Sequence, residues 1–109
     1  MRGEAQAKNE ELFRNVNEQI ETVSQTVERD DPFMEYLCEC DSRGCYETIQ
    51  ATRSEYESVR AEPTHFIVLA GHEDPRVERV AFANDRFLVV EKQGGAGHDA
   101  EQTDPRAPS

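Results

Sequence analysis

The stretch Leu37-Cys38-Glu39-Cys40-Asp41-Ser42-Arg43-Gly44-Cys45 holds all three cysteines of the 109-residue chain. Cys38 and Cys40 are one residue apart, so on a strand their side chains lie on the same face. The intervening Asp41-Ser42-Arg43-Gly44 is typical of a turn and would bring Cys45 back to the same place. Three thiolates on one hairpin suit a soft, tetrahedral cation. The stretch therefore predicts a hairpin stapled by zinc.

A closed structural zinc site needs a fourth ligand. The candidates are His72, His65, His98 and Asp41. His72 is preferred because it follows Gly71 at the end of a predicted strand, where its side chain can turn toward a neighbouring hairpin. His65 begins that strand, about 20 Å away by strand rise, and His98 lies in a segment with little to hold it. The predicted metal ligands are Cys38, Cys40, Cys45 and His72, with His65 and Asp41 left open. Glu73 is a candidate partner for the imidazole, which the sequence alone does not place.

The hydrophobic pattern predicts an α+β fold in which an N-terminal helix precedes a small, mainly antiparallel sheet with one short helix. The expected strands cover residues 33–40, 45–51, 65–69, 77–83 and 87–92, and the third of them, apolar on both faces, is expected to be central. Thr52 and Glu55 fit a capping box that starts the short helix, which should bury Tyr56 and Val59.

The N-terminal helix is expected over residues 8–28. An apolar seam at heptad spacing runs along it through Phe13, Val16, Ile20, Val23 and Val27, widened by Leu12. Such a short helix is unstable alone in water, so the seam must be covered. The seam is compatible with packing on the rest of the chain, and also with a homodimer formed through this helix.

The composition divides the chain into three parts. Residues 1–31 form the helical segment, and residues 32–93 contain the apolar residues of a small domain. Residues 94–109 are rich in Gly, Pro, Asp and Ser, and we expect them to be disordered. A core this small commonly needs a metal or disulfide staple, which adds weight to the cysteine cluster.

The formal net charge is −11, spread along the chain. Such a surface repels phosphate backbones and anionic membranes, so neither nucleic acid nor membrane is an expected partner, whereas a basic protein surface is. The N-terminus shows no apolar targeting segment and no run is long enough to span a bilayer. Three cysteines, an odd count, also fit a reducing compartment. We therefore expect a cytoplasmic protein.

Several short motifs of this chain resemble motifs in a family of small uncharacterised proteins from actinobacteria and related bacteria. The shared pattern is Cys38-Glu39-Cys40-x₄-Cys45, Glu55-Tyr56-Glu57-x-Val59-Arg60, Pro63-x-x-Phe66-x-Val68, Gly71-His72-Glu73 and Val89-Val90-Glu91-Lys92. The resemblance covers roughly residues 13–92. It implies that Gly71-His72 belongs with the cysteine cluster, and it brings no activity, substrate or partner.

No phosphate-binding loop or Gly-x-Ser-x-Gly elbow is present in the sequence, and a closed Cys₃His site leaves no position for a metal-bound water. The chain is therefore expected not to be an enzyme. The sequence favours a non-catalytic, zinc-stabilised protein-interaction or regulatory module. The alternatives are a thiol-based redox sensor that uses Cys38, Cys40 and Cys45, and three reduced cysteines that serve only as small buried side chains.

Overall fold

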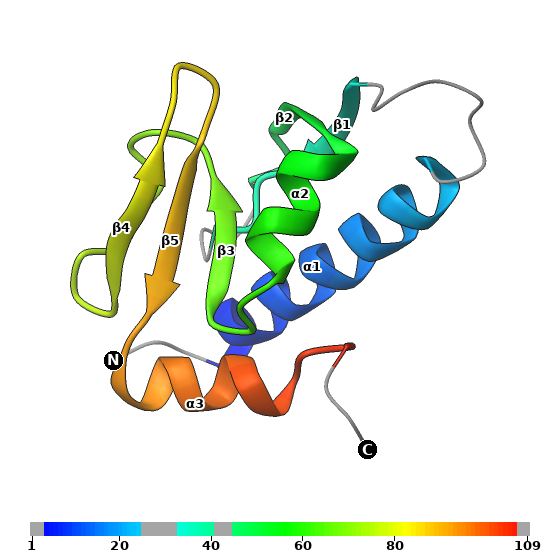
Figure 1. Cartoon of the computed structure of the whole chain (residues 1–109). Coiled ribbons are helices and arrows are strands. Elements are labelled where there is room, and N and C mark those ends of the chain that lie inside the picture. The colour runs from blue at the N-terminus through cyan, green and yellow to red at the C-terminus, as the bar shows by residue number, and fades with distance from the viewer. Residues whose placement is uncertain (1–3, 25–32, 41–44, 107–109) are drawn as a thin grey trace.

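The computed structural model of the chain describes residues 4–24, 33–40 and 45–106, and in the first range it places side chains from Glu11 to Val23. In chain order the elements are α1 Glu4–Ser24, β1 Phe33–Leu37, β2 Thr48–Thr52, α2 Arg53–Arg60, β3 His65–Val68, β4 Glu78–Ala83, β5 Leu88–Lys92 and α3 Gly94–Gln102. The strands form two antiparallel sheets, β1-β2 and β3-β5-β4. The predicted α+β class, with its N-terminal helix and antiparallel strands, is confirmed (Figure 1).

The cysteine-bearing hairpin is shorter than predicted. β1 ends at Leu37 and β2 begins at Thr48, so the cysteines lie beyond the strand ends. The Cys38 amide still donates to the Glu47 carbonyl oxygen at 2.9 Å, which prolongs the pairing by one step. After β2, Thr52 and Glu55 form the predicted capping box, and α2 starts at the next residue.

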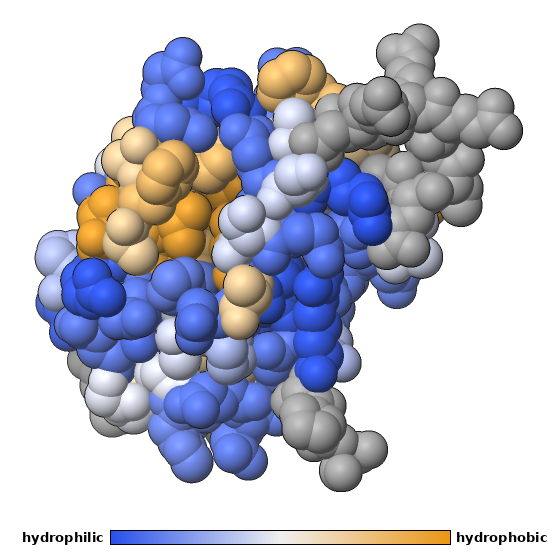
Figure 2. All heavy atoms as spheres, viewed as in Figure 1, coloured by the Kyte–Doolittle hydropathy of each residue, from blue (hydrophilic) through white to orange (hydrophobic). Residues whose placement is uncertain are grey.

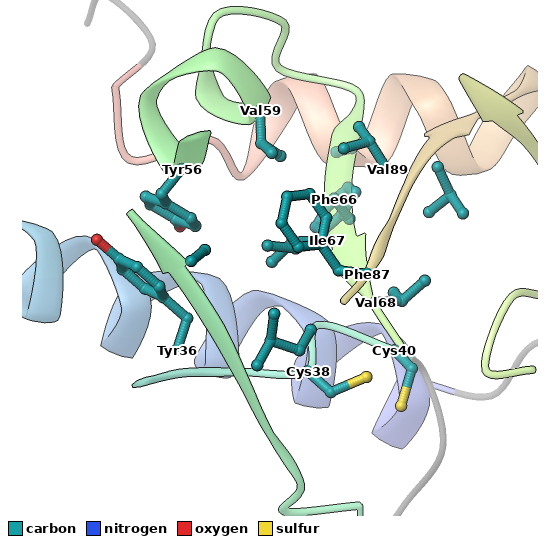
Figure 3. Close-up of a cluster of buried hydrophobic side chains, with 14 residues drawn as sticks. Tyr36, Cys38, Cys40, Tyr56, Val59, Phe66, Ile67, Val68, Phe87 and Val89 are labelled. Atoms are coloured by element: carbon teal, nitrogen blue, oxygen red, sulfur yellow. The ribbon is translucent and has the colours of Figure 1, made fainter. Parts of the chain in front are cut away.

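The core lies where α2, the β1-β2 hairpin and β3 meet (Figure 3). The Tyr36 and Tyr56 rings stack with centroids 4.4 Å apart. Tyr56 and Val59 are buried, as predicted for α2. Cys38 and Cys40 belong to the same buried cluster, with exposed fractions of 0% and 1%. The cysteine cluster is therefore continuous with the core.

The prediction that residues 65–69 form a central strand is wrong, because β5 is the middle strand and β3 lies at the edge. The edge is nevertheless covered by the cysteine stretch. The Glu39 amide donates to the Ile67 carbonyl oxygen at 2.8 Å, and the Ile67 amide donates to the Glu39 carboxylate at 3.1 Å. This cover explains why β3 is apolar on both faces although it is an edge strand.

Helix α1 buries a different face from the predicted seam. Phe13 is buried, but Val23 is 59% exposed and Leu12 is 55% exposed. The fully covered positions are polar: Arg14, Asn17 and Glu21 have exposed fractions of 0%, 0% and 4%. These polar groups bind backbone and charged groups of the domain, so the buried face lies beside the predicted seam and shares Phe13 and half-buried Ile20 with it. Val27 and the predicted end of the helix at residue 28 lie outside the described residues.

Asn17 shows why a polar residue can anchor α1. Its side-chain oxygen accepts from the Leu37 amide at 2.7 Å, and its side-chain amide donates to the Leu37 carbonyl oxygen at 2.8 Å. The side chain thus pairs with the end of β1 as a neighbouring strand would. Nearby, Arg53 donates to Glu21 at 2.8 Å.

We expect Ile20→Asp to destabilise the fold and Val23→Asp to have little effect. Ile20 is half-buried against the core, so a carboxylate there loses water contacts without gaining a partner. Val23 lies on the same helix with more than half of its surface exposed. Thermal melts of the two variants measure the difference, and equal melts would show that α1 does not pack through Ile20.

The predicted disorder of residues 94–109 is wrong for residues 94–102, which form α3. The helix lies across the lower end of the three-stranded sheet (Figure 1). Gly97 permits close approach, since a Cβ there would come within 2.8 Å of the Lys92 carbonyl oxygen. Arg14 donates to the Ala100 carbonyl oxygen at 2.8 Å, placing a cation at the C-terminal end of α3. Glycine has a low helix propensity, so α3, which contains several glycines, depends on its contact with α1, far away in sequence.

Deleting residues 94–109 is expected to lower the free energy of unfolding by about 2 kcal/mol or more, since hydrogen bonds to buried charged groups are each worth roughly that much. The deletion removes the partners of Arg14 on α3 and the Asp104 carboxylate that binds buried Arg60. Urea unfolding measures the effect. Glu101→Ala, at an exposed position of the same helix, is the control and should change little.

Candidate metal centre

The structure brings the four predicted ligands together. One ligand atom from each of Cys38, Cys40, Cys45 and His72 can be chosen so that all four lie within 4.8 Å of one another. Cys38 and Cys40 are buried, while Cys45 and His72 are half-buried. The three cysteines are not joined by disulfides. Figure 3 shows the sulfur atoms of Cys38 and Cys40 beyond the end of the hydrophobic cluster.

The distances from the His72 nitrogen to two of the sulfurs fit a tetrahedral ion. His72 Nδ1 lies 3.6 Å from the Cys38 sulfur and 3.6 Å from the Cys45 sulfur. With zinc–sulfur bonds of ~2.3 Å and zinc–nitrogen bonds of ~2.0 Å, a tetrahedron places nitrogen and sulfur about 3.5 Å apart. The two nitrogen–sulfur distances therefore already match the edge length of a tetrahedron around a zinc ion.

A tight turn after β3 delivers His72. Gly71 has φ +90°, a conformation that side-chain-bearing residues rarely adopt. The His72 amide donates to the Leu69 carbonyl oxygen at 3.0 Å and closes the turn. The Leu69 amide in turn donates to the Cys38 sulfur at 3.3 Å. The end of β3 thus supplies one ligand and a hydrogen bond to another.

Glu47 orients the imidazole of His72. Its carboxylate lies 3.2 Å from Nε2, the nitrogen opposite the one that faces the sulfurs. A carboxylate in this position fixes the imidazole tautomer and is a common feature of histidine–zinc sites. Glu73 was the candidate for this role, but its carboxylate accepts from the Gly71 amide at 2.7 Å. Nothing in the sequence marked Glu47, because its role depends on the strand register.

Glu39, between two of the ligands, is fully buried and joins the site to three elements. Its carboxylate accepts from Asn17 of α1 at 2.8 Å, from the Tyr56 hydroxyl of α2 at 3.0 Å and from the Ile67 amide of β3 at 3.1 Å. Burial raises the pKa of Glu39, and these donors oppose the rise. No pattern in the sequence marks Glu39 as a buried acid. Its position couples the ligand segment to α1, α2 and β3.

The thiols themselves are shifted toward the protonated form. The neighbouring Cys40 thiol and burial raise the pKa of Cys38. Burial also raises the pKa of Cys45. A metal ion binds thiolates and so must displace these protons, which makes its affinity increase with pH. Without a metal, thiols of raised pKa are poor nucleophiles.

The other two histidines lie away from the cysteines. His65, at the far end of β3, has Nε2 3.3 Å from a Glu91 carboxylate oxygen. His98 is exposed on α3. Asp41 falls outside the described residues. Of the three histidines, the structure therefore brings only His72 to the cysteines.

The fold and the site together define a small α+β protein with a Cys₃His cluster that can hold a metal ion. No protein-family profile, curated protein or solved structure matches the chain. The resemblance to the family of small actinobacterial proteins therefore stays a prediction. Within the described residues, no helix is both long and apolar enough to cross a membrane.

We expect His72→Ala to weaken zinc affinity by at least about tenfold, since losing even an outer partner of a ligand costs about 10–100-fold. His65→Ala is the matched control and should leave the affinity unchanged, because its imidazole pairs with Glu91. Competition with a chromophoric chelator measures both affinities. An affinity that depends on His65 and not on His72 would overturn the choice of fourth ligand.

Proposed function

We propose that this chain is a non-catalytic, cytoplasmic module that uses zinc to hold its ligand hairpin and serves in protein interaction or regulation. The observation that carries the proposal is the convergence of three cysteine sulfurs and one imidazole nitrogen within 4.8 Å. Three thiolates and an imidazole form a soft ligand set that favours zinc over magnesium or calcium.

A structural role for the metal is supported by how the site is built. Four protein ligands complete a tetrahedron and leave no position for water, which a catalytic zinc needs. Two of the ligands are part of the hydrophobic core, and Glu39 between them binds α1, α2 and β3. A metal here would stabilise the fold directly, because the segment that carries the ligands also joins the elements.

The interaction role is supported by charge and by exposed apolar residues. The net charge of −11 suits a partner with a basic surface and disfavours nucleic acid and anionic membranes. A homodimer through α1 is the second assembly that we predicted, and exposed Leu12 and Val23 would be its contacts. Sedimentation of wild type and Leu12→Asp would detect it.

Thiol titration with and without chelator tests the zinc role against a redox sensor. If zinc holds the site, untagged protein purified with its metal shows slow thiol modification, and chelation loosens the ligand hairpin so that three thiols per chain can be titrated. A redox sensor would instead show at least one fast thiol before chelation and form a reversible disulfide with mild peroxide. The second pattern, in protein that carries no metal, would overturn the proposal.

A further inference from the structure

The two edges of the three-stranded sheet differ. The β3 edge is covered by Glu39, whose backbone and carboxylate bind both polar groups of Ile67. β4 forms the opposite edge, and within the described part of the chain it pairs with β5 alone. Residues 79–83 of β4 are all exposed, including Val80 at 46% and Phe82 at 53%.

Edge strands of monomeric proteins usually carry charges, prolines or a covering element that block pairing with another chain. β4 has Arg79 near its start and then four apolar residues, Val80-Ala81-Phe82-Ala83, with a bulge in its pairing to β5 between Val80 and Phe82. Among the residues that the structure describes, no second strand pairs with its outer side, which lies beside apolar side chains. This combination is what a peptide requires to add a strand to a sheet.

A groove of about 340 Å³ lies beside this edge, between α2 and the sheet. Its floor is apolar, and its rim carries a hydroxyl, an imidazole and a carboxylate. The lining residues are Val59, Ala81, Phe82, Phe87, Val89 and, at the rim, Glu55, Ser58 and His65. Figure 2 shows hydrophobic residues gathered in a hollowed patch over the sheet, ringed by hydrophilic ones. The volume suits one or two large side chains more than an extended ligand.

We propose that β4 and this groove bind an extended, basic segment of a protein partner, which adds a strand to β4 and places an apolar side chain in the groove. The strand geometry follows from the unpaired edge, and the apolar anchor follows from the groove. The basic character follows from charge: a second copy of this chain would bring its own −11 to the interface, whereas a basic segment is attracted. The inference rests on the proposed interaction role and adds the surface and the partner's chemistry.

The probe is a synthetic peptide, acetyl-Lys-Val-Lys-Phe-Lys-Val-Lys-amide, added to the full-length, zinc-loaded protein. Its alternation presents Val, Phe and Val on one face of a strand and lysines on the other. We expect amide chemical-shift changes in β4 and in the groove, with affinity that falls as salt rises. Phe82→Lys should weaken binding by at least about tenfold, because it removes an apolar contact and adds a like charge.

Three controls make the outcome decisive. The same peptide with Glu in place of Lys should not bind, and a peptide with Pro in place of the fifth residue, a lysine, should bind about tenfold more weakly because it lacks a strand donor. Val23→Lys, at an exposed position of α1, should bind like wild type.

No binding, equal binding to Phe82→Lys, or equal binding of the proline peptide would overturn the proposal. A dimer that Phe82→Lys dissociates would instead assign this surface to a second copy. Zinc content, measured on the same samples, shows separately whether the metal site has failed.

Discussion

Cys45→Ser is expected to remove the zinc and to lower the free energy of unfolding by about 4 kcal/mol when free zinc exceeds the dissociation constant a thousandfold. Of the three cysteines, Cys45 is the cleanest to replace. It is half-buried, whereas Cys38 and Cys40 belong to the core and would add a packing cost of their own. The loss of stability should therefore report the metal.

The loss should also be local. Hydrogen exchange is expected to accelerate in β1, in β2 and in residues 69–72, because these segments carry the ligands or bind them. The β4–β5 hairpin, which supplies no ligand, should keep its protection. Chelation of the wild-type protein should give the same pattern, and Cys45→Ser should then respond no further to chelator. Apo protein as stable as the zinc-loaded form would contradict the structural role of the metal.

Glu39→Ala is expected to lower the free energy of unfolding by about 3 kcal/mol or more, since each buried donor left without an acceptor costs about 1–3 kcal/mol. The donors are Asn17, the Tyr56 hydroxyl and the Ile67 amide, from three different elements. Removing the carboxylate leaves the Tyr56 hydroxyl and the Ile67 amide without an acceptor in a site closed to water, while Asn17 keeps only its bond to the Leu37 carbonyl oxygen. The packing of α1 against β1 should weaken together with the metal site.

Two matched variants separate the hydrogen bonds from packing. Glu39→Gln keeps the volume and one good acceptor, so it should be milder than Glu39→Ala. Tyr56→Phe removes one of the three hydrogen bonds and should cost about 1 kcal/mol. Urea unfolding at fixed zinc concentration measures the series. Equal stability of Glu39→Ala and wild type would show that the carboxylate does not join the elements.

The ligand set could be predicted because it depends on local chemistry. The spacing of Cys38, Cys40 and Cys45 requires only a turn, and Gly71 marks the turn that delivers His72. The capping box at Thr52 was predictable for the same reason. The positions of most strands followed from short apolar runs between turn residues.

The errors arose where contacts between distant residues decide the structure. From the sequence, the polar residues Arg14, Asn17 and Glu21 would be placed on the solvent face of a helix. The partners of Arg14 and Asn17 lie 20 to 89 residues away in the chain, so the sequence does not reveal them. Helix α3 depends on Arg14 and on close packing of Gly97, which its own sequence does not reveal. Glu39 and Glu47 have roles set by strand register, so neither could be assigned from the sequence.

Native mass spectrometry of the untagged protein tests the central claim most directly. If Cys38, Cys40, Cys45 and His72 hold a structural ion, the wild-type chain carries one zinc and Cys45→Ser carries none under the same conditions. His65→Ala should retain the zinc. A wild-type chain that stays metal-free after purification with zinc present, and yet remains folded, would contradict the account.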